Sequence, residues 1–141
     1  MVTKNKKIFK TCSFYVSDFH LEMILIPYLN KKLKNNEEIK IVTEKNLKET
    51  VKILISKMNL DQKTKEEILE LGWDNINSDI SNNTNIIIIG SKKYIEEKNC
   101  LIENSNIENI NVVNCYEFDE VKDEMNEIVE EHDNTLNTLG N

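Results

Sequence analysis

Nine residues that can bind a ligand lie at or just beyond the ends of four apolar segments of the chain. In chain order they are Tyr15, Ser17, Asp18, His20, Glu44, Gly90, Ser91, Lys92 and Tyr116. Hydroxyl and carboxyl groups hydrogen-bond ligands, a histidine near an acid can transfer a proton, and a tyrosine combines an apolar ring with one polar group. We expect these residues to line a ligand-binding site. We assign a catalytic role to none of them.

The segment Gly90-Ser91-Lys92 is a candidate for binding phosphate, because backbone N–H groups at the start of a helix bind anions. The phosphate-loop pattern GxxxxGK[ST] and the dinucleotide pattern GxGxxG are both absent, and the 3 glycines of the chain cannot build either. The alternative interpretation is that Gly90 ends a strand and Ser91 caps the following helix.

The two histidines have different surroundings. Asp18 could orient His20 as a general base, but residues two apart on a helix do not face each other, so a capping or surface role is the alternative. His132 lies among acidic residues in a last helical turn, where we expect a solvated side chain that the helix dipole favours. With so few histidines and no cluster of histidine, cysteine and acidic residues, we expect no metal site.

The cysteines predict neither a disulfide framework nor a zinc site. Cys12, Cys100 and Cys115 are an odd number, and no two of them have the CxxC spacing. Cys12 and Cys115 fall inside apolar segments, where we expect their thiols to act as small apolar side chains.

The elements that position these residues are predicted from runs of apolar side chains. Ile86–Ile89 are four consecutive β-branched residues, as in a strand covered on both faces. Strands are predicted over residues 8–16, 38–43, 85–90 and 110–116. Helices are predicted over residues 19–34, 47–58, 63–71, 92–103 and 119–133. This alternation predicts an α/β three-layer sandwich, with a mostly parallel sheet of about four strands and helices on both faces.

A chain of 141 residues is expected to form one domain over residues 1–141. We expect a surface loop over residues 74–84, with Trp73 attaching its start to the core. The ends, residues 1–7 and 134–141, are predicted to be flexible, although Leu136 and Leu139 stand in helical register.

Charge and hydropathy exclude two classes of partner. The net charge is -7, whereas a general nucleic-acid binder needs a basic face, so we expect no nucleic-acid partner. No apolar run reaches the roughly 18–20 residues of a membrane span, and we expect no membrane association. The first ten residues lack the apolar core of a signal peptide, which predicts a cytoplasmic protein.

Residues 11–58 carry a pattern known from one family: a strand with the sequence CSFY, a helix with LIPYL, a second short strand and a helix led by leucine. The segments are Cys12–Tyr15, Leu25–Leu29, Ile39–Thr43 and Leu47. This pattern resembles the start of the MEDS sensory domain of methanogen and methylotroph regulators. That domain looks like a degenerate RecA/KaiC-type α/β core without a working phosphate loop. The family commonly has a histidine near the start of its first strand, where this chain has Lys10 and Thr11. The resemblance implies a sensory module that acts through a partner.

The leading hypothesis is a stand-alone, non-catalytic sensory or regulatory module without a cofactor. It binds a small molecule or a signalling partner, such as a kinase, a regulator or a second copy of the chain. The alternative is a Rossmann-like nucleotide- or phosphate-binding enzyme that holds phosphate with Ser91 and Lys92. In that alternative, Asp18 and His20 transfer a proton. A third hypothesis is an interaction protein that docks through its acidic last helix and C-terminal tail.

Overall fold

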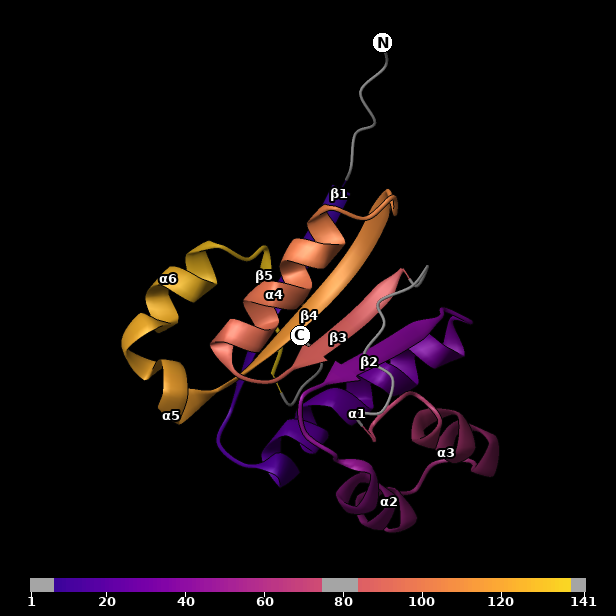
Figure 1. The fold of residues 1–141 in the computed structure, drawn as a ribbon. Coiled ribbons are helices and arrows are strands. Elements are labelled where there is room, and N and C mark those ends of the chain that lie inside the picture. Colours follow the sequence, from indigo (N-terminus) through magenta and orange to yellow (C-terminus); the bar gives the residue numbers. More distant parts are fainter. Residues whose placement is uncertain (1–6, 75–83, 138–141) are drawn as a thin grey trace.

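A computed structural model describes residues 7–74 and 84–137, which form an α/β fold around one parallel sheet (Figure 1). The 5-stranded sheet has the order β2-β3-β4-β1-β5. Its strands are β1 (Lys7–Tyr15), β2 (Ile39–Thr43), β3 (Asn85–Ile89), β4 (Asn109–Glu117) and β5 (Asn134–Thr135). The helices are α1 (Asp18–Lys34), α2 (Lys48–Ser56), α3 (Gln62–Leu69), α4 (Lys92–Glu103), α5 (Phe118–Val121) and α6 (Met125–Glu130). The predicted α/β fold, with its four strands, is confirmed, and β5 is an additional strand.

The isoleucine strand β3 lies inside the sheet, between β2 and β4, and all of its residues are buried. Its side chains alternate between the two faces of the sheet. Ile87 and Ile89 belong to one apolar core with α1, α2 and α3, whereas Ile86 and Ile88 belong to a second core with α4 and α6. Each buried isoleucine contributes roughly 1.5–3 kcal/mol, which explains why an unbroken apolar run is favourable here.

The segment after α3 is fixed to the first core by Trp73, as predicted. The indole is buried, and its Nε1–H donates a hydrogen bond to the Ile68 carbonyl at 2.7 Å. Gly72 precedes it with φ +104, and a Cβ at this position would lie 2.9 Å from the Ile41 carbonyl oxygen. Only glycine fits this turn without strain, so the close approach of the turn to β2 depends on it.

The C-terminal part of the chain differs from the prediction. The expected helix over residues 119–133 is divided into α5, a 3₁₀ turn (Lys122–Glu124) and α6. The prediction that residues 134–141 are flexible is wrong for residues 134–137. Asn134 and Thr135 pair with β1, Leu136 is buried, and Ser13 Oγ donates a hydrogen bond to the Leu136 carbonyl at 3.0 Å. The edge of β1 supplies backbone hydrogen-bond partners for β5. A strand of two residues is too short to show a periodic pattern in the sequence, so it was not predicted.

Parts of three predictions lie outside the described residues. These are residues 1–6 of the expected flexible start, residues 75–83 of the expected loop, and residues 138–141 with Leu139. Lys7 is the first residue of β1. Within residues 7–74 and 84–137, no helix combines the length and the apolar character needed to cross a membrane.

Candidate functional site

Four of the nine predicted residues meet at the carboxyl ends of the strands. They line a hollow of about 150 Å³ that we call the strand-end crevice. Its residues are Tyr15, Glu44, Lys45, Gly90, Ser91, Glu117 and Glu120. They converge because β1 to β4 are neighbours in a parallel sheet, so the segments that follow these strands lie along one edge.

The start of α4 lies in this crevice, but its backbone N–H groups already have partners. The Ser91 N–H donates to Glu44 Oε1 at 2.9 Å, and the Lys92 N–H donates to Glu120 Oε1 at 2.6 Å. The Ser91 hydroxyl oxygen accepts from the Tyr94 N–H as a helix cap. Two carboxylates of the chain therefore occupy the position that a phosphate would take, and they would repel it.

Gly90 allows side chains to pack closely at the start of α4. A Cβ there would lie 2.6 Å from the Tyr94 ring and 3.0 Å from the Glu44 side chain. The absence of a side chain lets Glu44 reach the start of α4. This geometry agrees with the alternative interpretation of Gly90 and Ser91 as the end of a strand and a helix cap.

The residues after β1 hold the start of α1. Ser17 Oγ accepts a hydrogen bond from the His20 N–H at 3.1 Å, and His20 Nδ1 accepts one from the Val16 N–H at 3.0 Å. The Asp18 carboxylate pairs with the Lys45 ammonium. Ser17 thus caps the helix, and the His20 ring bonds to the Val16 N–H rather than to Asp18.

Lys45 connects this turn to Tyr15. Its ammonium lies 4.9 Å from the centre of the Tyr15 ring. Removal of Tyr15 from water raises the pKa of its hydroxyl, although the nearby Lys45 charge acts in the opposite direction. Tyr15 is therefore neutral near pH 7, as an apolar wall with one hydroxyl group.

Tyr116 and Lys92 do not line the crevice. Tyr116 lies on the opposite face of the sheet from Tyr15, where its ring stacks on Phe14 with centroids 5.9 Å apart. The inclusion of Tyr116 in the predicted pocket was wrong, because β4 carries its side chains alternately on the two faces. The Lys92 ammonium pairs with Glu124 at 3.1 Å.

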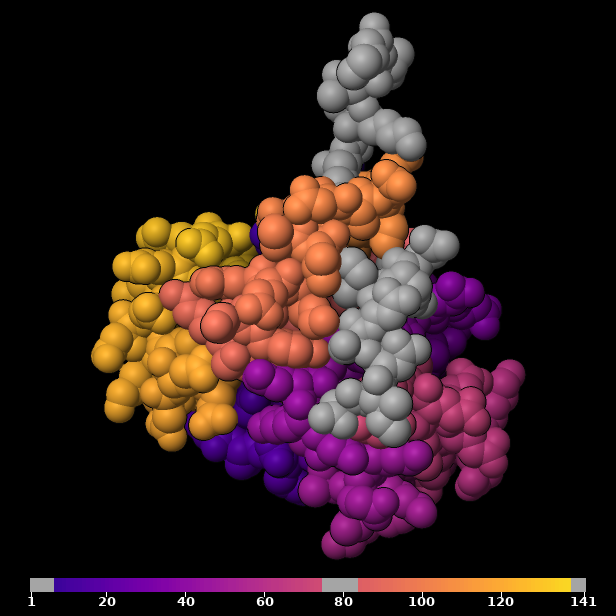
Figure 2. All heavy atoms as spheres, viewed as in Figure 1, coloured from indigo at the N-terminus to yellow at the C-terminus, as the bar shows by residue number. Residues whose placement is uncertain are grey.

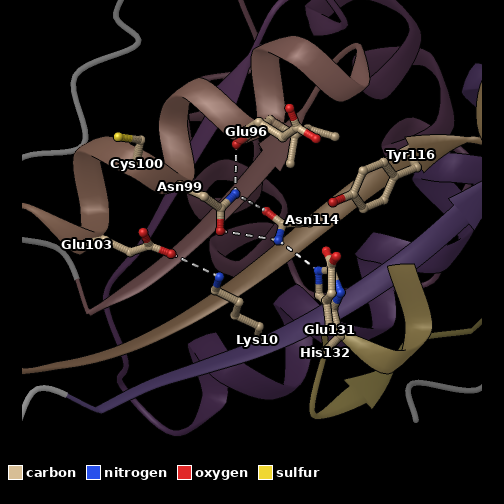
Figure 3. Close-up of a pocket in the computed structure, with 10 residues that line it drawn as sticks. Lys10, Glu96, Asn99, Cys100, Glu103, Asn114, Tyr116, Glu131 and His132 are labelled. Carbon is tan, nitrogen blue, oxygen red and sulfur yellow. Dashed lines mark hydrogen bonds and ion pairs between the residues drawn. The ribbon is translucent and has the colours of Figure 1, made fainter. Parts of the chain in front are cut away.

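A second hollow lies between α4 and the segment that follows α6, on the face where Tyr116 lies (Figure 3). This hollow, the Asn114 cavity, encloses about 180 Å³. Its residues are Lys10, Ile95, Glu96, Asn99, Cys100, Glu103, Asn114, Tyr116, Glu131 and His132. Figure 2 shows the α5–α6 segment beside α4 at the surface of the molecule.

Three polar side chains form a continuous hydrogen-bonded chain beside the cavity (Figure 3). The amides of Asn99 and Asn114 bond to each other in both directions, at 2.9 and 3.4 Å. The Asn114 amide also meets His132 Nε2 at 3.0 Å. Asn99 also donates to the Ile95 carbonyl at 2.8 Å. Asn99 and Asn114 are 9% and 2% exposed, so both amides depend on these protein partners rather than on water.

The position of His132 determines which ring nitrogen carries hydrogen. His132 Nδ1 contacts the Ile128 carbonyl oxygen, which only accepts, so Nδ1 is the donor. Nε2 then accepts from Asn114. Burial lowers the pKa of His132, which agrees with a neutral ring. The prediction of a solvated His132 was wrong, because β5 pairs with β1 and brings the preceding turn against the sheet.

Charged side chains surround the mouth of the cavity. The Lys10 ammonium pairs with the Glu103 carboxylate at 3.2 Å, and the carboxylates of Glu96 and Glu131 also line the hollow. Acidic groups therefore outnumber basic ones. In the residues that the structure describes, no group of three histidine, cysteine or acidic side chains is placed to hold a metal ion.

The sequence contains a signal for part of the Asn114 cavity, and the prediction did not include it. Asn114 interrupts the apolar run of β4, and Asn99 stands four residues after the buried Ile95. A polar residue at a buried position needs a partner, so this pair was open to prediction. The contribution of His132 depends on β5, which had no periodic signal.

Comparison of the chain with protein-family models, with curated proteins and with solved structures found no match. The resemblance to the MEDS domain stays a prediction from residues 11–58.

Proposed function

We propose that this chain is a non-catalytic sensory or regulatory module that binds a small polar molecule in the Asn114 cavity. The observation that carries the proposal is the hydrogen-bonded chain Asn99–Asn114–His132 along one wall of an open hollow. The two buried amide oxygens each keep one lone pair, and they can orient a ligand that donates hydrogen bonds, as the few polar groups of binding pockets generally do.

The size and charge of the cavity limit the ligand. Its volume of about 180 Å³ is below the roughly 300–1,000 Å³ of pockets for drug-sized molecules, so a nucleotide does not fit. The acidic mouth, with Glu96, Glu103 and Glu131 against Lys10, favours a cation and disfavours an anion. The ligand we propose is a small hydrophilic amine with further hydrogen-bonding groups.

The location of the cavity provides a way to transmit binding. One wall is α4, which packs on the second core through Ile95 and Ile102. The other wall includes Glu131 and His132, which are separated from the two-residue edge strand β5 only by Asp133. A ligand that bridges the two walls would stabilise β5 against local opening, since short edge segments have low local stability.

The regulatory part of the proposal includes a partner that recognises the C-terminal segment in its stabilised state, either a kinase or regulator or a second copy of the chain. The MEDS-like pattern of residues 11–58 supports this sensory role. We also place the protein in the cytoplasm, and its free thiols at Cys12, Cys100 and Cys115 agree with a reducing compartment.

A thermal-shift screen with small hydrophilic amines, amino acids, polyols and carboxylates tests the proposal. We expect a stabilising amine whose effect is reduced in Glu96→Gln and retained in Glu97→Gln. Glu97 is an exposed residue of the same helix that does not line the cavity, so it is a control for charge alone. A screen without a stabilising compound, or equal losses in both variants, would contradict the proposed site.

A further inference from the structure

A groove between α1 and α2 has mostly apolar walls and a buried acidic side chain. This α1–α2 groove encloses about 220 Å³ and is lined by Phe19, Glu22, Thr50, Ile53, Leu54 and Lys57. Phe19 and Ile53 are 62% and 57% exposed, although both are large apolar residues. The two side chains therefore present apolar surface beside the groove that a bound molecule could remove from water.

Glu22 gives the groove its polar specificity. The residue is 1% exposed, and its Oε2 atom has no hydrogen-bond partner in the structure. Burial raises the pKa of the Glu22 carboxyl, and the Asp18 charge acts in the same direction; the Thr50 hydroxyl and the Lys45 charge favour the ionised form. A buried acceptor without a donor is unfavourable, so the site gains stability from a ligand that supplies one.

We propose that the α1–α2 groove binds an amphipathic amine, whose ammonium group donates a hydrogen bond to Glu22 Oε2 while its apolar body packs between Phe19 and Ile53. A carboxylate only accepts hydrogen bonds, and its bond to a cation is stronger than its bond to a neutral donor. The net charge of -7 also attracts cations and repels anions. Because the groove lies on the opposite face of the sheet from the Asn114 cavity, this site goes beyond the proposed function.

The test is a series of straight-chain amines with a neutral analogue. Ethylamine, butylamine, hexylamine and hexanol are titrated into the ¹⁵N-labelled full chain, and the backbone amide shifts of α1 and α2 give the dissociation constants. We expect affinity to rise by about fourfold for each added methylene until the groove is filled, because burial of a methylene is favourable by about 0.8 kcal/mol. Hexanol should bind more weakly than hexylamine, because it lacks the cation.

Two variants separate the carboxylate from the apolar wall. Glu22→Gln should weaken hexylamine binding by about tenfold or more and leave hexanol binding unchanged. Its control is Glu49→Gln on the exposed surface of α2, which removes the same charge outside the groove and should leave the hexylamine affinity unchanged. Ile53→Ser should weaken hexylamine but not ethylamine. Ile53 is exposed, so this variant tests the site even if Glu22→Gln fails to fold.

Several outcomes would overturn the proposal. They are the absence of amine-induced shifts in α1 and α2, equal losses in Glu22→Gln and Glu49→Gln, and hexanol binding as tight as that of hexylamine. Binding of a lysine-containing peptide without binding of any free amine would also overturn it, because the groove would then be a protein-docking surface.

Discussion

The strand-end crevice and the Asn114 cavity are both small polar hollows against the same sheet, but they differ in which polar groups remain able to bind a ligand. In the crevice, the amides at the start of α4 donate to Glu44 and Glu120, so the groups that would attract a phosphate are occupied. In the cavity, the N–H groups of Asn99, Asn114 and His132 also have partners, but the two amide oxygens each keep one lone pair that can accept from a ligand. Topology places ligand-attracting groups at strand ends, but neighbouring side chains determine whether they are available.

Asn114→Ala is expected to have the largest effect on stability, because it disrupts the hydrogen-bonded wall of the Asn114 cavity. The substitution leaves Asn99 Oδ1 and His132 Nε2 without their shared partner, while Asn99 Nδ2 keeps its hydrogen bond to the Ile95 carbonyl. We expect a loss of about 2–4 kcal/mol in the free energy of unfolding, because each buried polar group without a partner costs about 1–3 kcal/mol. Urea unfolding measures it. Asn109→Ala, at the exposed start of the same strand, should change stability by no more than about 0.5 kcal/mol.

Leu136→Ala tests whether the C-terminal segment holds the second wall of the cavity in place. Leu136 is buried against the first core, and a buried leucine-to-alanine change costs about 2–5 kcal/mol. We expect the lower end of this range, because β5 is a short edge strand. Hydrogen exchange should also accelerate at the Leu136 amide, which donates to Cys12. Leu101→Ala, an exposed leucine of α4, is the control and should change neither quantity.

Acidification sharpens the comparison, because the Asn114 cavity contains a half-buried neutral histidine. Burial lowers the pKa of His132 below its ordinary value of 6.5. The unfolded chain therefore binds more protons than the folded chain as the pH falls through 6.5. His132 should cost the fold up to about 1.4 kcal/mol of stability per pH unit below that point.

His132→Gln removes this titration, so its stability should fall less than that of the parent between pH 7.5 and 5.5. The control is Asn109→Ala at the exposed start of β4, which should keep the acid sensitivity of the parent. Equal pH profiles for the parent and His132→Gln would contradict the neutral ring.

The smallest effect is expected in the crevice. Glu120→Ala removes the acceptor of the Lys92 N–H at the start of α4, which should lower the free energy of unfolding by about 0.3–1 kcal/mol. Inorganic phosphate should stabilise neither the parent nor this variant, because Glu44 still occupies the Ser91 N–H. Stabilisation of the parent by millimolar phosphate would contradict the account, because the N–H groups of the crevice would then be available to an anion.

The sheet was predictable because its signal is local and strong. Four consecutive isoleucines identify a strand that is buried on both faces, and the periodic helices between the strands predict the parallel arrangement. Strand order and the position of β5 were not predictable, since they depend on which distant backbone groups remain unpaired beside β1.

The candidate site was predictable only in part. Tyr15, Glu44, Gly90 and Ser91 meet because parallel strands end at one edge of the sheet. Tyr116 was misplaced because residues next to a strand end alternate between the faces. His132 was misjudged because its partial burial requires β5.

The most direct test of the proposed function follows the side-chain amide signals of Asn99 and Asn114 by ¹⁵N NMR while small hydrophilic amines are added. The account predicts that at least one amine shifts both signals in a saturable way, together with the backbone amides of β5. Amines that leave both signals unchanged, or that perturb only residues away from the Asn114 cavity, would contradict it.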